Sequence, residues 1–321
     1  MAFGSFELIC NRAYIPLCQL VGPYDGSTIF GQGIIARCFP RTIIIANTMI
    51  FSVGNLFLHL GGLVLIGIAI YNVYGKYTAV GRREMLDLFY LFFFLEVWSL
   101  ITDAGVSPVV SASYPYFVAI QCGLSSAVVL QLLCTSLLFY QLWEDGNTAS
   151  VWALRISSTI WGLVTFVIAI LTFQGGKSGW PSLLNPTNTV ALMIVLYVVN
   201  AVFMFFYAVF SFYLCAFTLK NWWAFGTYAL SLFTFVSGQL LMYAFGFLIC
   251  NSVRHYIDGV FFGTACNLFA FLMIYRAYDT ITAEDLEFTV SLRDDPFADE
   301  SEPEDLDEYS SFSNYKFVEP N

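Results

Sequence analysis

The stretch "RHYIDGVFFGTACNLF", residues 254–269, brings together the residue types that could do chemistry. A catalytic zinc ion normally takes three protein ligands, commonly His with Asp, Glu or Cys, and keeps one position open for water. His255 could supply one ligand, and Asp258 a second from the same face of a helix. The chain has only two histidines and no His-x-x-x-His pair. We therefore predict no metal, no cofactor and no catalytic residue.

The composition indicates which kind of protein holds this stretch. Of the 321 residues, 58% are hydrophobic, 18% are aromatic and only 11% are charged. A water-soluble domain of this length could not bury so much apolar surface, so we expect a multi-pass membrane protein. Its partners would then include membrane lipid but no nucleic acid.

Seven stretches are apolar enough to cross a hydrocarbon core, which takes about 20 helical residues. All ten prolines fall in tails, in loops or at helix boundaries, so we expect unbroken helices in one all-α bundle. The predicted spans lie near residues 46–72, 85–104, 116–142, 152–174, 188–216, 223–249 and 257–278.

Charge divides the chain into three parts. Fourteen of the 23 acidic residues lie in residues 279–321, which hold only two basic residues. This segment is too acidic and too poor in aliphatic residues to pack a core, so we expect disorder there. The predicted organisation is a lumenal segment 1–45, a bundle 46–278 and an acidic cytosolic tail 279–321.

The orientation follows from the basic residues near the helix ends. With a lumenal N-terminus, six of them face the cytosol and four face the lumen, so the positive-inside rule favours a cytosolic C-terminus. Cys10, Cys18, Cys38 and Cys250 then lie on the oxidising side, where disulfides form. Four cysteines allow three pairings, and the sequence does not choose among them. Four unpaired small hydrophobic side chains are the alternative.

Two ionisable residues are predicted at mid-membrane. His59 lies near the middle of the first span and Glu96 near the middle of the second, so antiparallel neighbours would hold them at similar depth. An ionisable group in the membrane is a functional candidate and needs a partner. The pair could be a proton relay, but we favour a structural hydrogen-bonded pair. Asp87, Asp103 and Asp258 are expected near helix ends, where water or headgroups solvate them.

Helix packing is the expected role of Gly259 and Gly263. Their small-xxx-small spacing lets two helix backbones approach closely inside a membrane. The partner helix would lie within the bundle or, as the alternative, in another membrane protein.

Two further segments are candidates for contacts outside the membrane. The loop Trp143-Glu144-Asp145-Gly146 combines an interfacial tryptophan with a solvated acidic pair. The tail contains Asp285-Leu286-Glu287-Phe288, whose di-acidic spacing is of the kind that recruits vesicle coat machinery for export from the endoplasmic reticulum.

The sequence also resembles a known family, the fungal chitin synthase export chaperones. The resemblance runs through almost the whole chain, although the acidic stretch after about residue 290 is less typical. It is carried by "RCFPRTIIIANTMIFSVGN" (37–55), "KYTAVGR" (76–82), "DAGVSP" (103–108), "SYPYFVAIQ" (113–121), "LWEDG" (142–146), "HYIDGVFFGTACN" (255–267) and "DLEF" (285–288).

This resemblance implies a non-catalytic, multi-pass protein of the endoplasmic reticulum membrane. Its client would be a chitin synthase, which it helps to fold or assemble and to leave that compartment for cell wall synthesis; it could then reach the plasma membrane with that client. The Gly259–Gly263 face, the Trp143–Gly146 loop and the Asp285–Phe288 segment are candidate contacts. A seven-helix receptor for a small ligand is the alternative, although no Asn-Pro-x-x-Tyr turn occurs in the seventh span.

Overall fold

A computed structural model describes residues 4–22, 33–38, 40–45, 48–140, 147–176 and 184–293. It describes their side chains too, except those of residues 45, 48–50, 138 and 283–293. The chain separates into two compact units, Met1–Ile281 and Thr282–Asn321. Everything that follows concerns the first unit unless stated otherwise.

Seven helices within the described ranges are long and apolar enough to cross a membrane, which confirms the predicted count. The fifth span is composite, and a short helix follows the sixth. The spans are α2 (Val53–Gly75), α3 (Arg82–Asp103), α4 (Tyr114–Leu138), α5 (Thr148–Gln174), the run α6 (Val190–Met193), η2 (Ile194–Val199), α7 (Asn200–Tyr213) and η3 (Leu214–Thr218), then α8 (Trp222–Tyr243) and α10 (Gly259–Arg293).

The first span begins later than predicted. Residues from 46 onward were expected to be helical, but β1 (Ile43–Ile45) and β2 (Thr48–Ile50) pair antiparallel, with Ile43 opposite Ile50. The β-branched isoleucine run favours extended backbone over helix. The helix α2 therefore starts only at Val53.

The last two spans also differ from the expected bounds. The helix α8 ends at Tyr243, and the separate short helix α9 (Gly246–Ser252) replaces the predicted continuation to residue 249. The helix α10 continues to Arg293, so the predicted start of a disordered tail at residue 279 falls inside a helix. Residues 294–321 lie outside the described part of the chain.

The expectation of unbroken helices needs a correction in the fifth span. Its backbone stays helical, but it widens into π-helical segments at Ile194–Val199 and Leu214–Thr218. Such segments arise without proline, because they need only one extra residue in a turn. The proline positions therefore could not reveal them.

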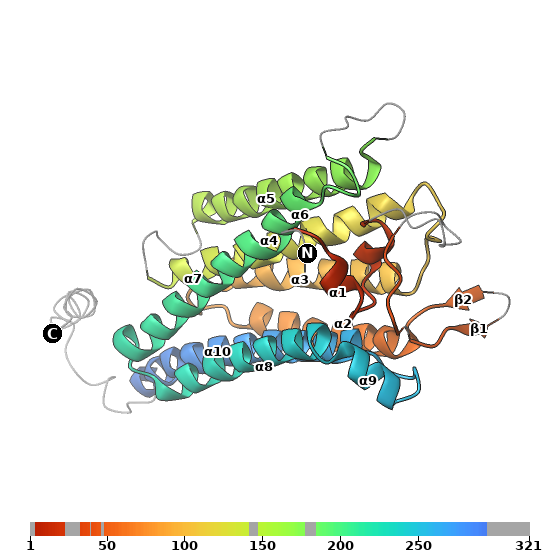
Figure 1. Cartoon of the computed structure of the whole chain (residues 1–321). Coiled ribbons are helices and arrows are strands. Elements are labelled where there is room, and N and C mark those ends of the chain that lie inside the picture. The colour runs from red at the N-terminus through yellow and green to blue at the C-terminus, as the bar shows by residue number, and fades with distance from the viewer. Residues whose placement is uncertain are drawn as a thin grey trace, which may run out of the picture. The chain divides into compact units, whose positions relative to one another are not determined.

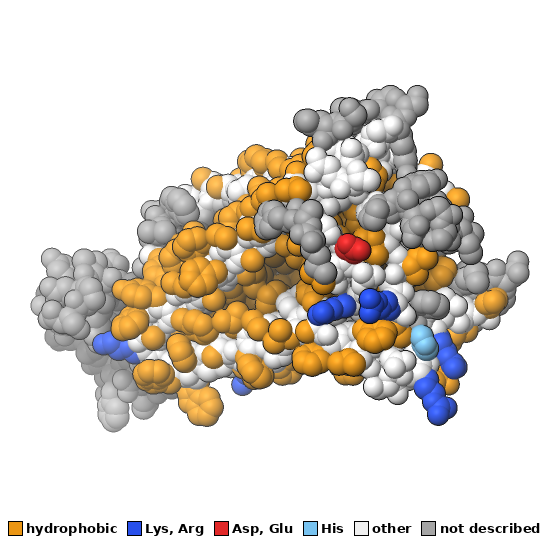
Figure 2. All heavy atoms as spheres, in the orientation of Figure 1, with side chains coloured by type: hydrophobic (Ala, Val, Ile, Leu, Met, Phe, Trp, Pro, Cys, Tyr) orange, Lys and Arg blue, Asp and Glu red, His pale blue; other side chains and the backbone are white. Residues whose placement is uncertain are grey.

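Aromatic stacking holds α10 against α3. The Phe92 ring stacks on the Phe271 ring with centroids 3.6 Å apart, and Phe89 meets the same ring edge-on at 5.3 Å. The helices α8 and α10 run side by side (Figure 1). Between them, Ser231 Oγ donates a hydrogen bond to the Ala270 carbonyl oxygen at 2.8 Å. Figure 2 shows hydrophobic side chains along the flank of the helices, with most visible charged ones near the end where α9 lies.

The N-terminal segment packs on one end of the bundle. The short helix α1 (Glu7–Cys10) and the 3₁₀ turn η1 (Pro16–Gln19) share a buried apolar cluster with residues of α4 and α5. Tyr114 at the start of α4 donates its hydroxyl to the Pro16 carbonyl at 3.0 Å. This segment is therefore part of the fold rather than a free tail.

Two glycines allow α4 and α5 to pack closely. A Cβ placed on Gly162 would lie 3.0 Å from the Gly123 carbonyl oxygen and 3.1 Å from the Ala127 Cβ. These atoms belong to backbone and to a short side chain, which cannot move aside. Dispersion contacts of this kind take the place of the missing hydrophobic drive between helices in lipid.

We predict that Gly162→Val lowers the free energy of unfolding by about 1–3 kcal/mol, because overpacking forces the two helices apart. The measurement is the thermal midpoint of the purified protein in detergent. Gly226→Val on α8 is the matched control, since a Cβ there meets no atom within 4 Å. Equal midpoints for the two variants would contradict the predicted role of the contact.

Candidate functional site

A buried polar cluster joins α2 to α3. His59 Nδ1 lies 2.5 Å from Glu96 Oε2, and His59 Nε2 lies 3.2 Å from Asp103 Oδ2. Asn55 donates a hydrogen bond from Nδ2 to the same Asp103 oxygen. The His59 side chain is 3% exposed and that of Glu96 8%, so both are withdrawn from lipid and water. We call these four residues the His59 network.

Helix periodicity explains how the four side chains meet. Asn55 and His59 are one turn apart on α2, and Glu96 and Asp103 are two turns apart on α3. Each pair therefore lies on one face of its helix. The sequence placed His59 and Glu96 together but assigned Asp103 to a solvated helix end. The spacing of seven between Glu96 and Asp103 was the signal that could have found it.

The electrostatics of the His59 network favour a positioning role. Two carboxylates face one imidazole, so each ring nitrogen has an acidic partner. Charges removed from water are stable only when they are paired and hydrogen-bonded. The network thereby fixes the depth of α2 relative to α3.

Asp258 caps α10 rather than binding a metal. Its Oδ1 accepts a hydrogen bond from the Phe261 backbone N–H at 3.1 Å, as an N-cap carboxylate does. The residue is only 5% exposed, so the expected solvation by water or headgroups is wrong. Burial raises the pKa of Asp258 to about 6; the Phe261 hydrogen bond opposes this rise and the charge of Asp103 adds to it.

The four cysteines expected on the oxidising side form two disulfides. Cys10 pairs with Cys18, and Cys38 pairs with Cys250 across 212 residues of sequence. Both bonds lie in buried surroundings, and the sequence had left the pairing open.

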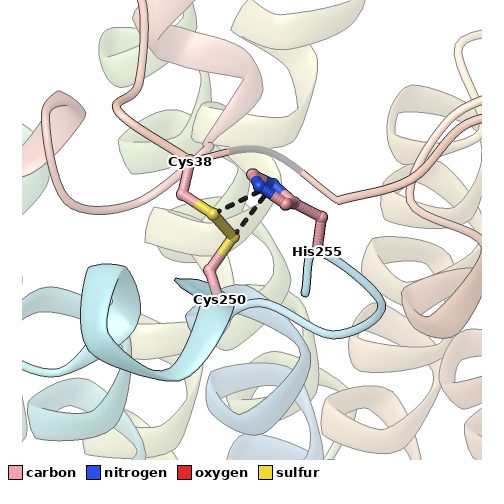
Figure 3. A group of neighbouring side chains, drawn as sticks. All are labelled: Cys38, Cys250 and His255. Carbon is pink, nitrogen blue, oxygen red and sulfur yellow. Dashed lines mark hydrogen bonds between the residues drawn. A yellow bond between two sulfur atoms is a disulfide. The ribbon is translucent and has the colours of Figure 1, made fainter. Parts of the chain in front are cut away.

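His255 lies beside the second disulfide. Its Nδ1 is 3.2 Å from Cys38 Sγ and 3.9 Å from Cys250 Sγ (Figure 3). The three ligand-type atoms are close enough to hold a metal ion in principle. In this state the two sulfur atoms are bonded to each other, so neither is a thiolate ligand. These three residues therefore do not form a metal site while the disulfide is intact.

The glycine pair predicted for helix packing lies inside the bundle. A Cβ on Gly259 would lie 2.5 Å from Gly246 Cα, and one on Gly263 would lie 3.2 Å from the Met242 side chain. Both glycines thus face α8 and α9, which leaves no room there for a helix of another protein. The loop Trp143–Gly146 lies outside the described residues. Residues 285–288 belong to α10, but their side chains are not described.

Comparison with known proteins decides the family. The chitin synthase export chaperone family matches residues 2–292. Relatives described as "Chitin synthase export chaperone" are 47% identical in Candida albicans, over 92% of this chain and 94% of the relative, and 46% identical in Debaryomyces hansenii, over 91% and 93%. A third, in Emericella nidulans, is 47% identical over 91% and 87%. The chain belongs to the chitin synthase export chaperone family.

The resemblance found in the sequence is thereby confirmed. The matched range includes the His59 network, both disulfides and the Asp258 cap, and ends one residue short of the end of α10. No solved structure matches the chain.

We predict that His59→Ala lowers the free energy of unfolding by about 3–5 kcal/mol, because the buried Glu96 carboxylate loses its imidazole partner and Asp103 loses one of its two recorded partners. The measurement is the thermal midpoint in detergent. Thr159→Ala on the exposed face of α5 is the control, since Thr159 bonds only within its own helix. An unchanged midpoint for His59→Ala would show that the network does not hold α2 against α3.

Proposed function

We propose that this protein is a membrane chaperone that helps a chitin synthase leave the endoplasmic reticulum. The observation that carries the proposal is the family match over residues 2–292, together with relatives of that name at 46–47% identity. This match favours the chaperone over the receptor-like alternative. The client is itself a membrane protein, so seven apolar helices place the chaperone in the same layer.

We further infer that the role needs no catalysis by this chain. The ionisable groups of the His59 network are engaged with one another, and Asp258 caps a helix. The disulfides occupy four of the eight cysteines. What supports a chaperone is a fixed arrangement of helices whose outer faces carry large apolar side chains, including Phe205, Phe217 and Phe233.

A lumenal N-terminus is the proposed orientation. Both disulfides tie segments at one end of the bundle, and disulfides persist in the lumen of the secretory pathway but not in the cytosol. An odd number of spans then puts the C-terminus and its acidic residues in the cytosol. There the Asp285–Phe288 segment could meet vesicle coat proteins.

Added glycosylation acceptors test the orientation directly, because the sequence has no Asn-x-Ser/Thr acceptor of its own. We expect an acceptor appended before Met1 to be glycosylated and one appended after Asn321 to stay unmodified. The gel mobility of each protein, before and after enzymatic removal of glycans, is the measurement. Asn→Gln in the added acceptor is the control. Modification at the C-terminus would overturn the orientation.

The chaperone proposal predicts where a fluorescently tagged chitin synthase accumulates in fungal cells that lack this gene. We expect retention in the endoplasmic reticulum, reversed by the full chain. Asp285→Ala with Glu287→Ala should fail to restore delivery, because the proposed coat contact loses both carboxylates. The location of the client by microscopy, with the chaperone level checked by immunoblot, is the measurement.

Asp305→Ala with Asp307→Ala is the matched control, since it removes the same charge from a second acid-Leu-acid run in the tail. Full delivery by both double variants would remove Asp285–Phe288 from the proposal. Normal delivery in the absence of the gene would remove the chaperone function itself.

A further inference from the structure

The Cys38–Cys250 disulfide, unlike Cys10–Cys18, has an imidazole recorded beside its sulfur atoms. His255 Nδ1 is within 3.9 Å of both sulfur atoms, so whichever sulfur leaves during thiol–disulfide exchange does so next to that ring (Figure 3). A leaving thiolate that is better stabilised leaves faster. For Cys10–Cys18, the recorded side-chain contact is a weak one, from Cys18 Sγ to the Ala13 carbonyl at 3.9 Å.

Two arginines contact or adjoin the loop that carries His255. The Arg41 guanidinium stacks 4.2 Å above the Tyr256 ring and donates to the Tyr256 hydroxyl at 3.0 Å. The Arg41 backbone N–H also donates to the His255 carbonyl at 2.9 Å, and the exposed Arg254 precedes the histidine. A nearby cationic side chain favours the thiolate form of a cysteine.

The loop that presents His255 is strained. Arg254 and His255 have φ angles of 53° and 68°, so two successive non-glycine residues adopt the left-handed conformation. Such a residue is strained and persists only where the surrounding structure enforces it. Here the loop is enforced by the disulfide and by hydrogen bonds that join His255 to Cys250 and Arg41. Breaking the disulfide therefore lets the loop relax.

From this geometry we propose that Cys38–Cys250 is a thiol–disulfide exchange site for a lumenal dithiol oxidoreductase. The site rests on the proposed lumenal placement of these segments. A thiolate of the oxidoreductase attacks one sulfur, forms a mixed disulfide and displaces the other as a thiolate, which His255 stabilises. The second thiol of the oxidoreductase then attacks the mixed disulfide. The oxidoreductase ends as a disulfide, and Cys38 and Cys250 end as two thiols.

A short stretch of chain connects this disulfide to the transmembrane bundle. The disulfide joins the segment before β1 to the end of α9, and three residues after His255 the chain reaches Asp258, the cap of α10. Reduction thus uncouples the N-terminal segment from the start of the seventh span. Oxidation restores the loop in its strained conformation.

The test compares two bonds within one molecule. The purified full chain in detergent is treated with dithiothreitol, quenched with acid and alkylated, and each cysteine pair is followed by peptide mass spectrometry. We expect Cys38–Cys250 to be reduced faster than Cys10–Cys18, on the order of tenfold. Both bonds are buried, so general access does not favour either. Equal rates, or faster reduction of Cys10–Cys18, would overturn the proposal.

The variant His255→Gln then tests the contribution of the imidazole. We expect it to slow reduction of Cys38–Cys250 by about threefold or more, because the leaving thiolate loses its stabilising neighbour, while the Cys10–Cys18 rate stays unchanged and reports an intact fold. An unchanged rate at Cys38–Cys250 would remove His255 from the mechanism and so overturn the proposal.

A third measurement names the partner. A thioredoxin-fold oxidoreductase that lacks its resolving cysteine should be trapped as a mixed disulfide on Cys38 or Cys250 and not on Cys10 or Cys18. Trapping at Cys10 or Cys18 alone would contradict the assignment of this bond. All three measurements use the protein without a client, so their outcome is independent of the export assay.

Discussion

A hydrocarbon layer offers backbone N–H and C=O groups no hydrogen-bond partner, and most of this structure follows from that constraint. Each span satisfies its own backbone by being helical, including the fifth, where two segments widen to the π form without leaving a gap. Helices in lipid are not driven together by the hydrophobic effect. Their contacts must therefore come from close packing, from polar pairs and from covalent bonds.

The bundle uses these three kinds of contact in different places. Glycines bring α4 against α5, and stacked phenylalanines bring α10 against α3. The His59 network joins α2 to α3, while Arg155 of α5 forms two 2.7 Å hydrogen bonds to Asp87 of α3. The disulfides act at the end of the bundle that carries the N-terminal segment. An arrangement fixed in this way suits a protein whose proposed task is to present a surface to a membrane client.

Residues 254–269, whose residue types suggested a metal or catalytic site, instead begin and pack the last span. Asp258 caps a helix, and Gly259 and Gly263 pack closely against α8 and α9. His255 lies against the disulfide that joins Cys250 to Cys38, 212 positions away in the sequence. The Cys38–Cys250 disulfide and the imidazole beside it lie outside the spans, in the segment before β1 and around α9.

Several features were determined by the sequence alone. Runs of apolar residues of sufficient length must span as helices, so the count of seven followed from composition and hydropathy. Ordered blocks of sequence were enough to indicate the family. His59 and Glu96 were placed at one depth because antiparallel neighbours of known length leave little choice.

Only the tertiary structure decided the remaining contacts, because they depend on how distant segments of the chain pack against one another. The pairing of four cysteines depends on where 212 residues of intervening chain bring Cys250, and the place of Asp103 depends on how far α3 slides along α2. The orientation of His255 follows from two successive left-handed residues, a conformation that is uncommon outside glycine. Local preference and membrane thickness set the spans, whereas long-range packing set the chemistry between them.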